Sequence, residues 1–118
     1  MERQAMRTVT LGLASPQDAK NRLRAALKDE PQGEFISFTS VELMWKVLTA
    51  KRWQLLKMMT GAGSMTIREA ARRVERDVKA VHADIQALLE VGILLKTEDG
   101  LIEFPYDRIK VDFMLAAA

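Results

Sequence analysis

Two short helical patterns with almost no chain between them constrain this sequence more than any other feature. The first begins at Thr66 and places apolar residues on one face, at steps of three and four: Ile67, Ala70, Ala71 and Val74. The second does the same over its length, with Val78, Val81, Ile85, Leu88 and Leu89. Because so little chain links the two, the helices must cross sharply. Residues 64–92 therefore predict a helix-turn-helix.

Local signals mark where both helices begin and where the second ends. Thr66 and Glu69 have the spacing of a capping box, in which the hydroxyl accepts from an early amide and Glu69 reaches back. Asp77 is a natural N-cap for the second helix, and Gly92 is a natural stop just past its end.

A β-hairpin is predicted directly after Gly92. Residues 93–97 and 101–104 are apolar enough for two short strands, and Glu98-Asp99-Gly100 between them has glycine where a positive φ is needed. A hairpin in this position is typical of the wing of a winged helix.

The run from Thr66 to Phe104, including the Leu88-Leu-Glu-Val-Gly-Ile-Leu94 junction, resembles the winged helix-turn-helix transcriptional regulators of the MarR and ArsR type. The layout of residues 36–113 also looks like a narrower group of small regulators. The matching segments are Leu48-Thr-Ala-Lys-Arg-Trp53, Ile67-Arg-Glu-Ala-Ala-Arg-Arg73, Arg76 to Asp84, and Pro105-Tyr-Asp107. Members of that group are often encoded beside a small toxin, and some are thought to act as its antitoxin. The resemblance thus implies repression through residues 66–92 and masking of a small toxin protein by another surface.

The amino-terminal third predicts a separate unit. Residues 8–14 alternate as a strand, Ser15 and Pro16 start a helix, and residues 34–39 form a second strand. The expected fold is α+β, with a strand-helix-strand extension over residues 1–39 and a winged helix-turn-helix over residues 40–118. The extension is too small to bury its faces alone, and it could lie on the winged helix or pair with the same unit of another copy. Because its edge strand offers unpaired amides, a homodimer is expected.

Two helices are predicted between the extension and Thr66, capped by Ser40 and Thr49. Trp45 and Trp53 are expected in the core. Lys51 and Arg52 fall in the first turn of the second helix, where cations oppose the helix dipole. A docked DNA phosphate could offset that cost, and simple solvation is the alternative.

The second helix of the helix-turn-helix is the predicted reader of double-stranded DNA. With its apolar face against the core, the outward positions are Lys79, Ala80, Ala83, Gln86 and Ala87. Lys79 could donate to guanine or phosphate, Gln86 could read adenine, and the alanine methyls could touch thymine.

Arg76 in the turn could reach a phosphate or a guanine. Phosphate contacts are also expected from Arg72 and Arg73, and from the Thr66 amide at the start of the first helix. For Lys79 and Arg76 the alternative is a role in solubility alone. His82 lies at the edge of the apolar face and is predicted to be packed or capped.

Composition excludes several function classes. There is no cysteine and only one histidine in 118 residues, so no metal site, cofactor or catalytic cluster is predicted, and the chain is not expected to be an enzyme. No apolar run has the length of a membrane span, and the first residues lack the apolar core of a signal peptide. A cytoplasmic protein is expected.

A net charge of only +2 and the acidic wing tip at Glu98 and Asp99 leave a second interpretation open. This is a winged helix that binds proteins and has no role in DNA binding.

Overall fold

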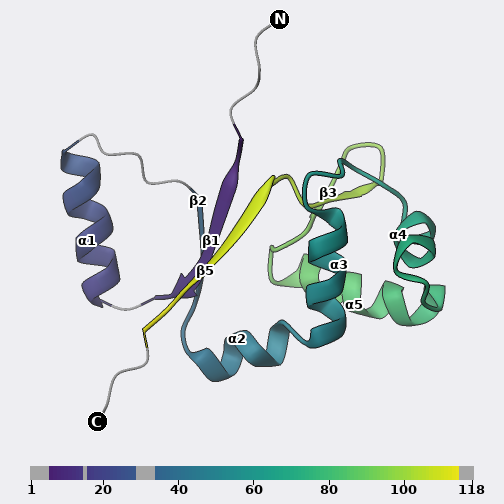
Figure 1. Cartoon of the computed structure of the whole chain (residues 1–118), viewed down its shortest axis with the longest axis horizontal. Helices are drawn as coiled ribbons and strands as arrows, with labels where there is room; N and C mark the ends of the chain where they lie inside the picture. The colour runs from purple at the N-terminus through teal and green to yellow at the C-terminus, as the bar shows by residue number, and fades with distance from the viewer. Residues whose placement is uncertain (1–5, 15, 29–33, 115–118) are drawn as a thin grey trace, which may run out of the picture.

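The computed structural model describes residues 6–14, 16–28 and 34–114, and it shows a mixed α+β fold (Figure 1). In chain order the elements are β1 (Thr8–Leu13), α1 (Pro16–Leu27), β2 (Glu34–Phe38), α2 (Val41–Val47), α3 (Ala50–Met59), α4 (Ile67–Val74), α5 (Val78–Glu90), β3 (Leu95–Lys96), β4 (Ile102–Glu103) and β5 (Arg108–Asp112). The α+β class predicted from the sequence is confirmed. Ser15, the predicted cap of α1, lies outside the described residues.

The strands β2, β1 and β5 form a parallel sheet in that order, with β1 in the middle. Leu11 of β1 lies opposite both Ile36 and Val111. The chain thus leaves the sheet after β2, builds α2 to β4, and returns to it as β5. The predicted division at residue 39 placed this last strand with the second part of the chain, whereas the structure places it beside β1.

One hydrophobic core runs from the sheet to α5. Alternation along β1 buries Val9 and Leu11 on the face that meets the helices, and Phe38 of β2 joins them. Beyond them the core continues through Met44, Leu55, Leu56, Met59, Ile85 and Leu88. Figure 1 shows α1 standing apart on the other side of the sheet from α3, α4 and α5, and its Leu23 and Leu27 are exposed.

The predicted break between α2 and α3 is confirmed. The Ser40 hydroxyl accepts from the Leu43 amide at 3.0 Å, and the Thr49 hydroxyl accepts from the Arg52 amide at 3.3 Å. The prediction that Trp45 is in the core is wrong, because its side chain faces outward, 56% exposed, and packs edge-to-face on Phe113 at 6.0 Å. Trp53 is half-buried against the core.

Between α4 and α5 the chain turns within three residues. The Thr66 hydroxyl accepts from the Glu69 amide at 3.0 Å, and the Asp77 carboxylate accepts from the Ala80 amide at 3.3 Å, so both predicted caps form. Glu75 in the turn adopts a left-handed conformation with φ of 55°. The returning half of the capping box was predicted wrongly, because the Glu69 carboxylate accepts from Arg72 and Arg73 instead.

The hairpin after α5 is shorter than predicted. Leu95 and Lys96 lie opposite Glu103 and Ile102, while Ile93 and Leu94 are buried in the core and are not part of a strand. Ile102 also bridges Met65, which ties the start of α4 to the hairpin.

Candidate nucleic-acid interface

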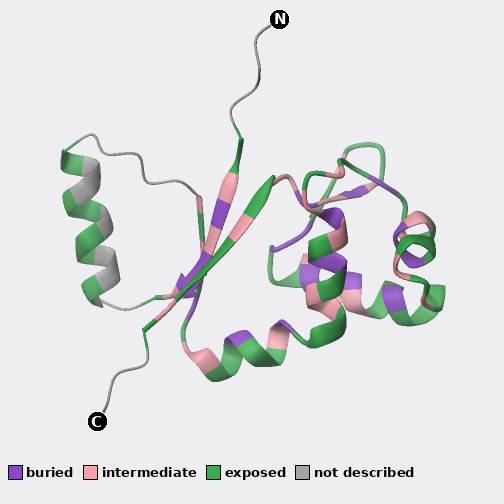
Figure 2. Ribbon diagram, in the orientation of Figure 1, coloured by how far each residue is buried: buried purple, intermediate pink, exposed green. Residues whose placement is uncertain are grey.

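The inner side of α5 is anchored in the core. Val81, Ile85 and Leu88 are fully buried, and α5 packs against both α3 and α4. Figure 2 shows buried segments spaced along this helix. Val78 was predicted to join them but is 43% exposed. The first buried residue of α5 is Val81, so the first turn of the helix projects past the edge of the core.

The outer side of α5 carries small and polar side chains. The predicted outward residues Lys79, Ala80, Ala83 and Gln86 are all exposed, and Ala87 is half-buried. His82, predicted to be packed or capped, is exposed on this same side. The outer face therefore presents a lysine, a histidine and an amide, separated by alanines that leave the helix backbone accessible.

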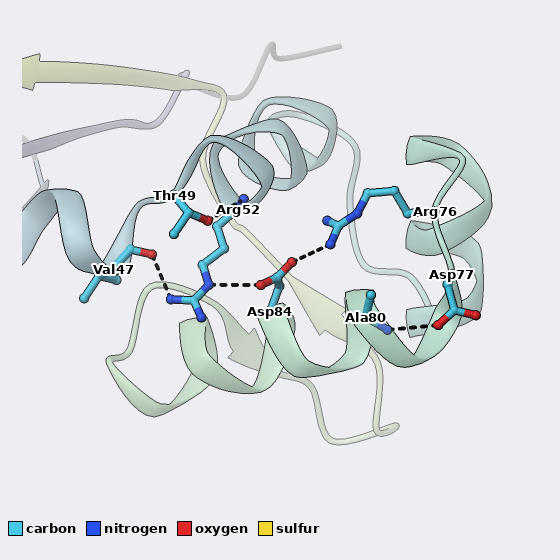
Figure 3. Close-up of polar contacts among 7 residues, drawn as sticks. All are labelled: Val47, Thr49, Arg52, Arg76, Asp77, Ala80 and Asp84. Carbon is cyan, nitrogen blue, oxygen red and sulfur yellow. Dashed lines mark hydrogen bonds and ion pairs between the residues drawn. The ribbon is translucent and has the colours of Figure 1, made fainter.

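Asp84 fixes the orientation of α5 through two arginines (Figure 3). Its carboxylate accepts from the Nε of Arg52 at 3.1 Å and from an Nη of Arg76 at 2.7 Å. Arg52 also donates to the Val47 carbonyl at 3.0 Å. The cluster thus joins the end of α2, the first turn of α3, the α4–α5 turn and the middle of α5.

The Asp84 cluster is largely buried, with side-chain exposures of 17% for Asp84, 16% for Arg76 and 23% for Arg52. Burial raises the pKa of Asp84, but the hydrogen bonds from Arg76 and Arg52 lower it more, so the pKa lies below the ordinary value of 3.8. The three groups together carry one net positive charge. One Nη of Arg76 is buried and makes no hydrogen bond within the described part of the chain.

These contacts change the roles expected for two of the predicted DNA-binding residues. Arg76 was predicted to reach a phosphate or a guanine, and Arg52 either a phosphate or only solvent. In the structure both are bound to Asp84. The cost of placing Arg52 at a helix start is offset by this carboxylate and by the Val47 carbonyl. Sequence reasoning missed Asp84, although an acidic residue between the core positions Val81 and Ile85 indicates a paired charge.

A second cluster lies on the surface of α4. The Glu69 carboxylate accepts from Arg72 at 2.7 and 2.6 Å and from Arg73 at 2.9 Å. Hydrogen bonds from Arg72, and then from Arg73, lower the pKa of Glu69 to about 2. Both arginines were predicted to contact the DNA backbone, and they remain exposed while they are paired, Arg72 by 72%.

The other predicted contact residues lie at the surface. Thr66, Lys51 and Lys79 are exposed, and neither lysine makes an ion pair among the residues that the structure describes. Glu98 and Asp99 at the tip of the hairpin are also exposed. The described residues include no cluster of side chains able to hold a metal ion and no helix long and apolar enough to span a membrane.

Comparison with known proteins gives a family and no individual relative. The model of the HVO_A0114 family matches residues 47–111, from the end of α2 to β5, which is more than half of the chain. Searches of curated proteins and of solved structures returned no match.

Proposed function

We propose that this chain, which belongs to the HVO_A0114 family, is a sequence-specific DNA-binding transcriptional regulator built on a winged helix-turn-helix. In this proposal α4 and α5 form the helix-turn-helix and the β3–β4 hairpin forms the wing. The outer face of α5 enters the major groove. Arg72, Arg73, Lys51 and the amide of Thr66 contact the DNA backbone on either side.

The observation that carries the proposal is the contrast between the two sides of α5. Its inner side is held by three buried residues and by the Asp84 cluster, so the helix has one orientation. Its outer side is exposed at Lys79, Ala80, Ala83 and Gln86, with no described element over it. A rigid helix with a lysine, an amide and small side chains on its open face suits reading of base edges.

His82 joins the proposed reading face because it is exposed one turn beyond Lys79. Arg76 and Arg52 leave the set of direct phosphate ligands and become positioning residues that act through Asp84. The net positive charge of their cluster still favours a polyanion.

A second candidate function is favoured by the distribution of charge. Four of the arginines that could have bound phosphate are paired within the chain, two to Asp84 and two to Glu69. The hairpin tip is acidic at Glu98 and Asp99. Both features suit a winged helix that binds a basic protein surface in place of DNA.

We further propose a role for this chain in the control of its own operon. Repression of its own operon follows from the DNA-binding proposal and from the resemblance to small regulators encoded beside toxins. A small toxin partner depends on that resemblance alone. The cytoplasm is the compartment that suits a DNA-binding regulator.

The proposal is tested by measuring how the full chain binds duplex fragments from the region upstream of its own gene. Fluorescence anisotropy at several salt concentrations gives the affinity. We expect Lys79→Ala to weaken binding about three- to tenfold and to lower the salt slope by about one, because one phosphate or guanine contact is lost. Lys46→Ala is the matched control. Lys46 is also an exposed lysine but lies on α2, so its loss should leave the affinity unchanged.

Two results would contradict the proposal, the first for DNA binding itself and the second for the reading surface. If the wild-type chain retains no duplex even at low salt, the protein-interaction function is favoured. If Lys79→Ala and Lys46→Ala weaken binding equally, the outer face of α5 is not the reading surface. The chain then binds DNA only through non-specific electrostatic attraction.

A further inference from the structure

The strand β5 has one edge against β1 and the other edge open. It lies at the end of the sheet order, and no described strand pairs with its outer edge. An edge of this kind presents backbone amides and carbonyls that can pair with a strand from another chain. Val111, the fourth of the five residues of β5, is 43% exposed, which is unusual for a β-branched residue on the apolar side of a sheet.

An apolar groove follows this open edge on the side of the helices. One hollow of about 480 Å³ lies between β5 and the two helices α2 and α3, and its lining includes Val111, Trp45 and Trp53. A second hollow of about 360 Å³ continues past Trp53 to Ile109. A strand added beside β5 would place alternate side chains over this groove.

The charges on β5 are complementary to those of a second, antiparallel copy. Lys110 and Asp112 lie on the polar face of the sheet and are exposed. With a two-fold axis at Val111, each Lys110 lies opposite the Asp112 of the other copy, and each Ile109 lies opposite Phe113. An axis at Lys110 would bring each Arg108 opposite an Asp112, but it would also set two lysines against each other at its centre, which is destabilising. Only the axis at Val111 leaves no like charges directly opposed.

We propose that the chain forms a homodimer in which the β5 strands of two copies pair antiparallel about Val111. The two sheets then join into one sheet of six strands, and Ile109, Val111 and Phe113 of each copy cover the groove of the other. The β2 edge is less suited to self-pairing, because its one charged residue, Glu34, is already bound to Arg7. In Figure 1 α4 and α5 lie at the far end of the chain from the C-terminus of β5, so this pairing leaves them uncovered.

Charge exchange at two positions tests this pairing in the full chain without DNA, so its outcome is independent of the DNA-binding proposal. In the Lys110→Asp variant, the new aspartate of each copy lies opposite Asp112 of the other copy. In the Asp112→Lys variant, the new lysine of each copy lies opposite Lys110 of the other copy. Each dimer therefore contains two repulsive pairs. We expect each single variant to raise the dimer dissociation constant at least about tenfold in sedimentation equilibrium. The double variant Lys110→Asp/Asp112→Lys restores both pairs and the wild-type constant.

Mixing the two single variants gives the sharpest result. One chain then carries aspartate at both positions and the other carries lysine at both, so every facing pair is of opposite charge. Native mass spectrometry should show a heterodimer, although each variant alone is mostly monomeric. Ser37→Lys and Ser37→Asp change the charge of the opposite edge strand and should leave the wild-type constant unchanged. A monomeric wild type, single variants that dimerise as the wild type does, or a mixture without heterodimer would each overturn the proposal.

Discussion

Two carboxylates in this chain each hold two arginines, and they do so in opposite settings. Asp84 is largely buried and binds Arg52 and Arg76, which lie 32 and 8 residues away in the sequence. Glu69 is partly exposed, at 29%, and binds the exposed Arg72 and Arg73, which lie three and four residues further along the same helix. The chemistry of the contacts is the same, and their consequences for the fold and the interface differ.

This difference determines which arginines can exchange their carboxylate partner for a ligand. Breaking a buried pair leaves a charge without water or a partner, so the Asp84 cluster has to remain closed for α5 to keep its position. An exposed pair within one helix is weak, because water solvates both partners when it opens. Arg72 and Arg73 can therefore exchange Glu69 for phosphate at little cost, whereas Arg76 and Arg52 cannot leave Asp84.

The largest expected effect follows from removing the Asp84 charge. Asp84→Asn leaves two largely buried guanidinium groups without their carboxylate, and we expect the free energy of unfolding to fall by about 2–3 kcal/mol. Urea unfolding followed by circular dichroism measures this change. Glu69→Gln is the matched control, since it also neutralises a carboxylate with two arginines, and its effect should be much smaller.

Binding data extend the same comparison. Because Asp84 holds α5 in position, the fraction of Asp84→Asn that stays folded should bind DNA more weakly than the wild type at equal folded concentration. Equal losses of stability in Asp84→Asn and Glu69→Gln would show that burial does not separate the two clusters.

The pH dependence of stability gives a second, smaller effect. The pKa of Asp84 in the folded chain is below its ordinary value of 3.8, so the folded state favours the charged form. Its contribution is complete well above that value and is lost as the pH falls through the lowered pKa. The stability difference between the wild type and Asp84→Asn should thus be constant from about pH 7 to 5 and narrow below about pH 4. Urea midpoints over this range provide the measurement, and a difference that widens in acid would contradict the assignment.

Much of the fold could be predicted because its signals are local. The caps at Ser40, Thr49, Thr66 and Asp77 depend on side chains within three residues of the amides they bind, and all four form. The alternation of polar and apolar residues over 108–113 is a local signal of the same kind, and β5 forms there. The alternation carried no information on which strand would be its neighbour, and the pairing with β1 joins residues about a hundred positions apart.

The candidate site was predictable in its outer half and not in its inner half. Helical periodicity correctly placed Lys79, Ala80, Ala83 and Gln86 at the surface. Periodicity does not show which polar groups meet at the margin of the core, and so it missed the two arginines bound by Asp84. Trp45 was misplaced for a related reason, since an apolar side chain can equally face an open groove.

The smallest expected effect concerns the cluster of Glu69, Arg72 and Arg73, and it tests whether the two arginines contact DNA. Glu69→Gln releases Arg72 and Arg73 from their carboxylate, and if these arginines contact DNA the affinity should rise about two- to fivefold at low salt. Glu75→Gln is the matched control, because it removes an exposed negative charge next to α4 that makes no ion pair among the described residues. A larger gain for Glu69→Gln than for Glu75→Gln in fluorescence anisotropy would mean that the released guanidinium groups bind phosphate. Equal gains would mean that affinity depends only on net charge, and would contradict the proposal that Arg72 and Arg73 of α4 contact the DNA backbone.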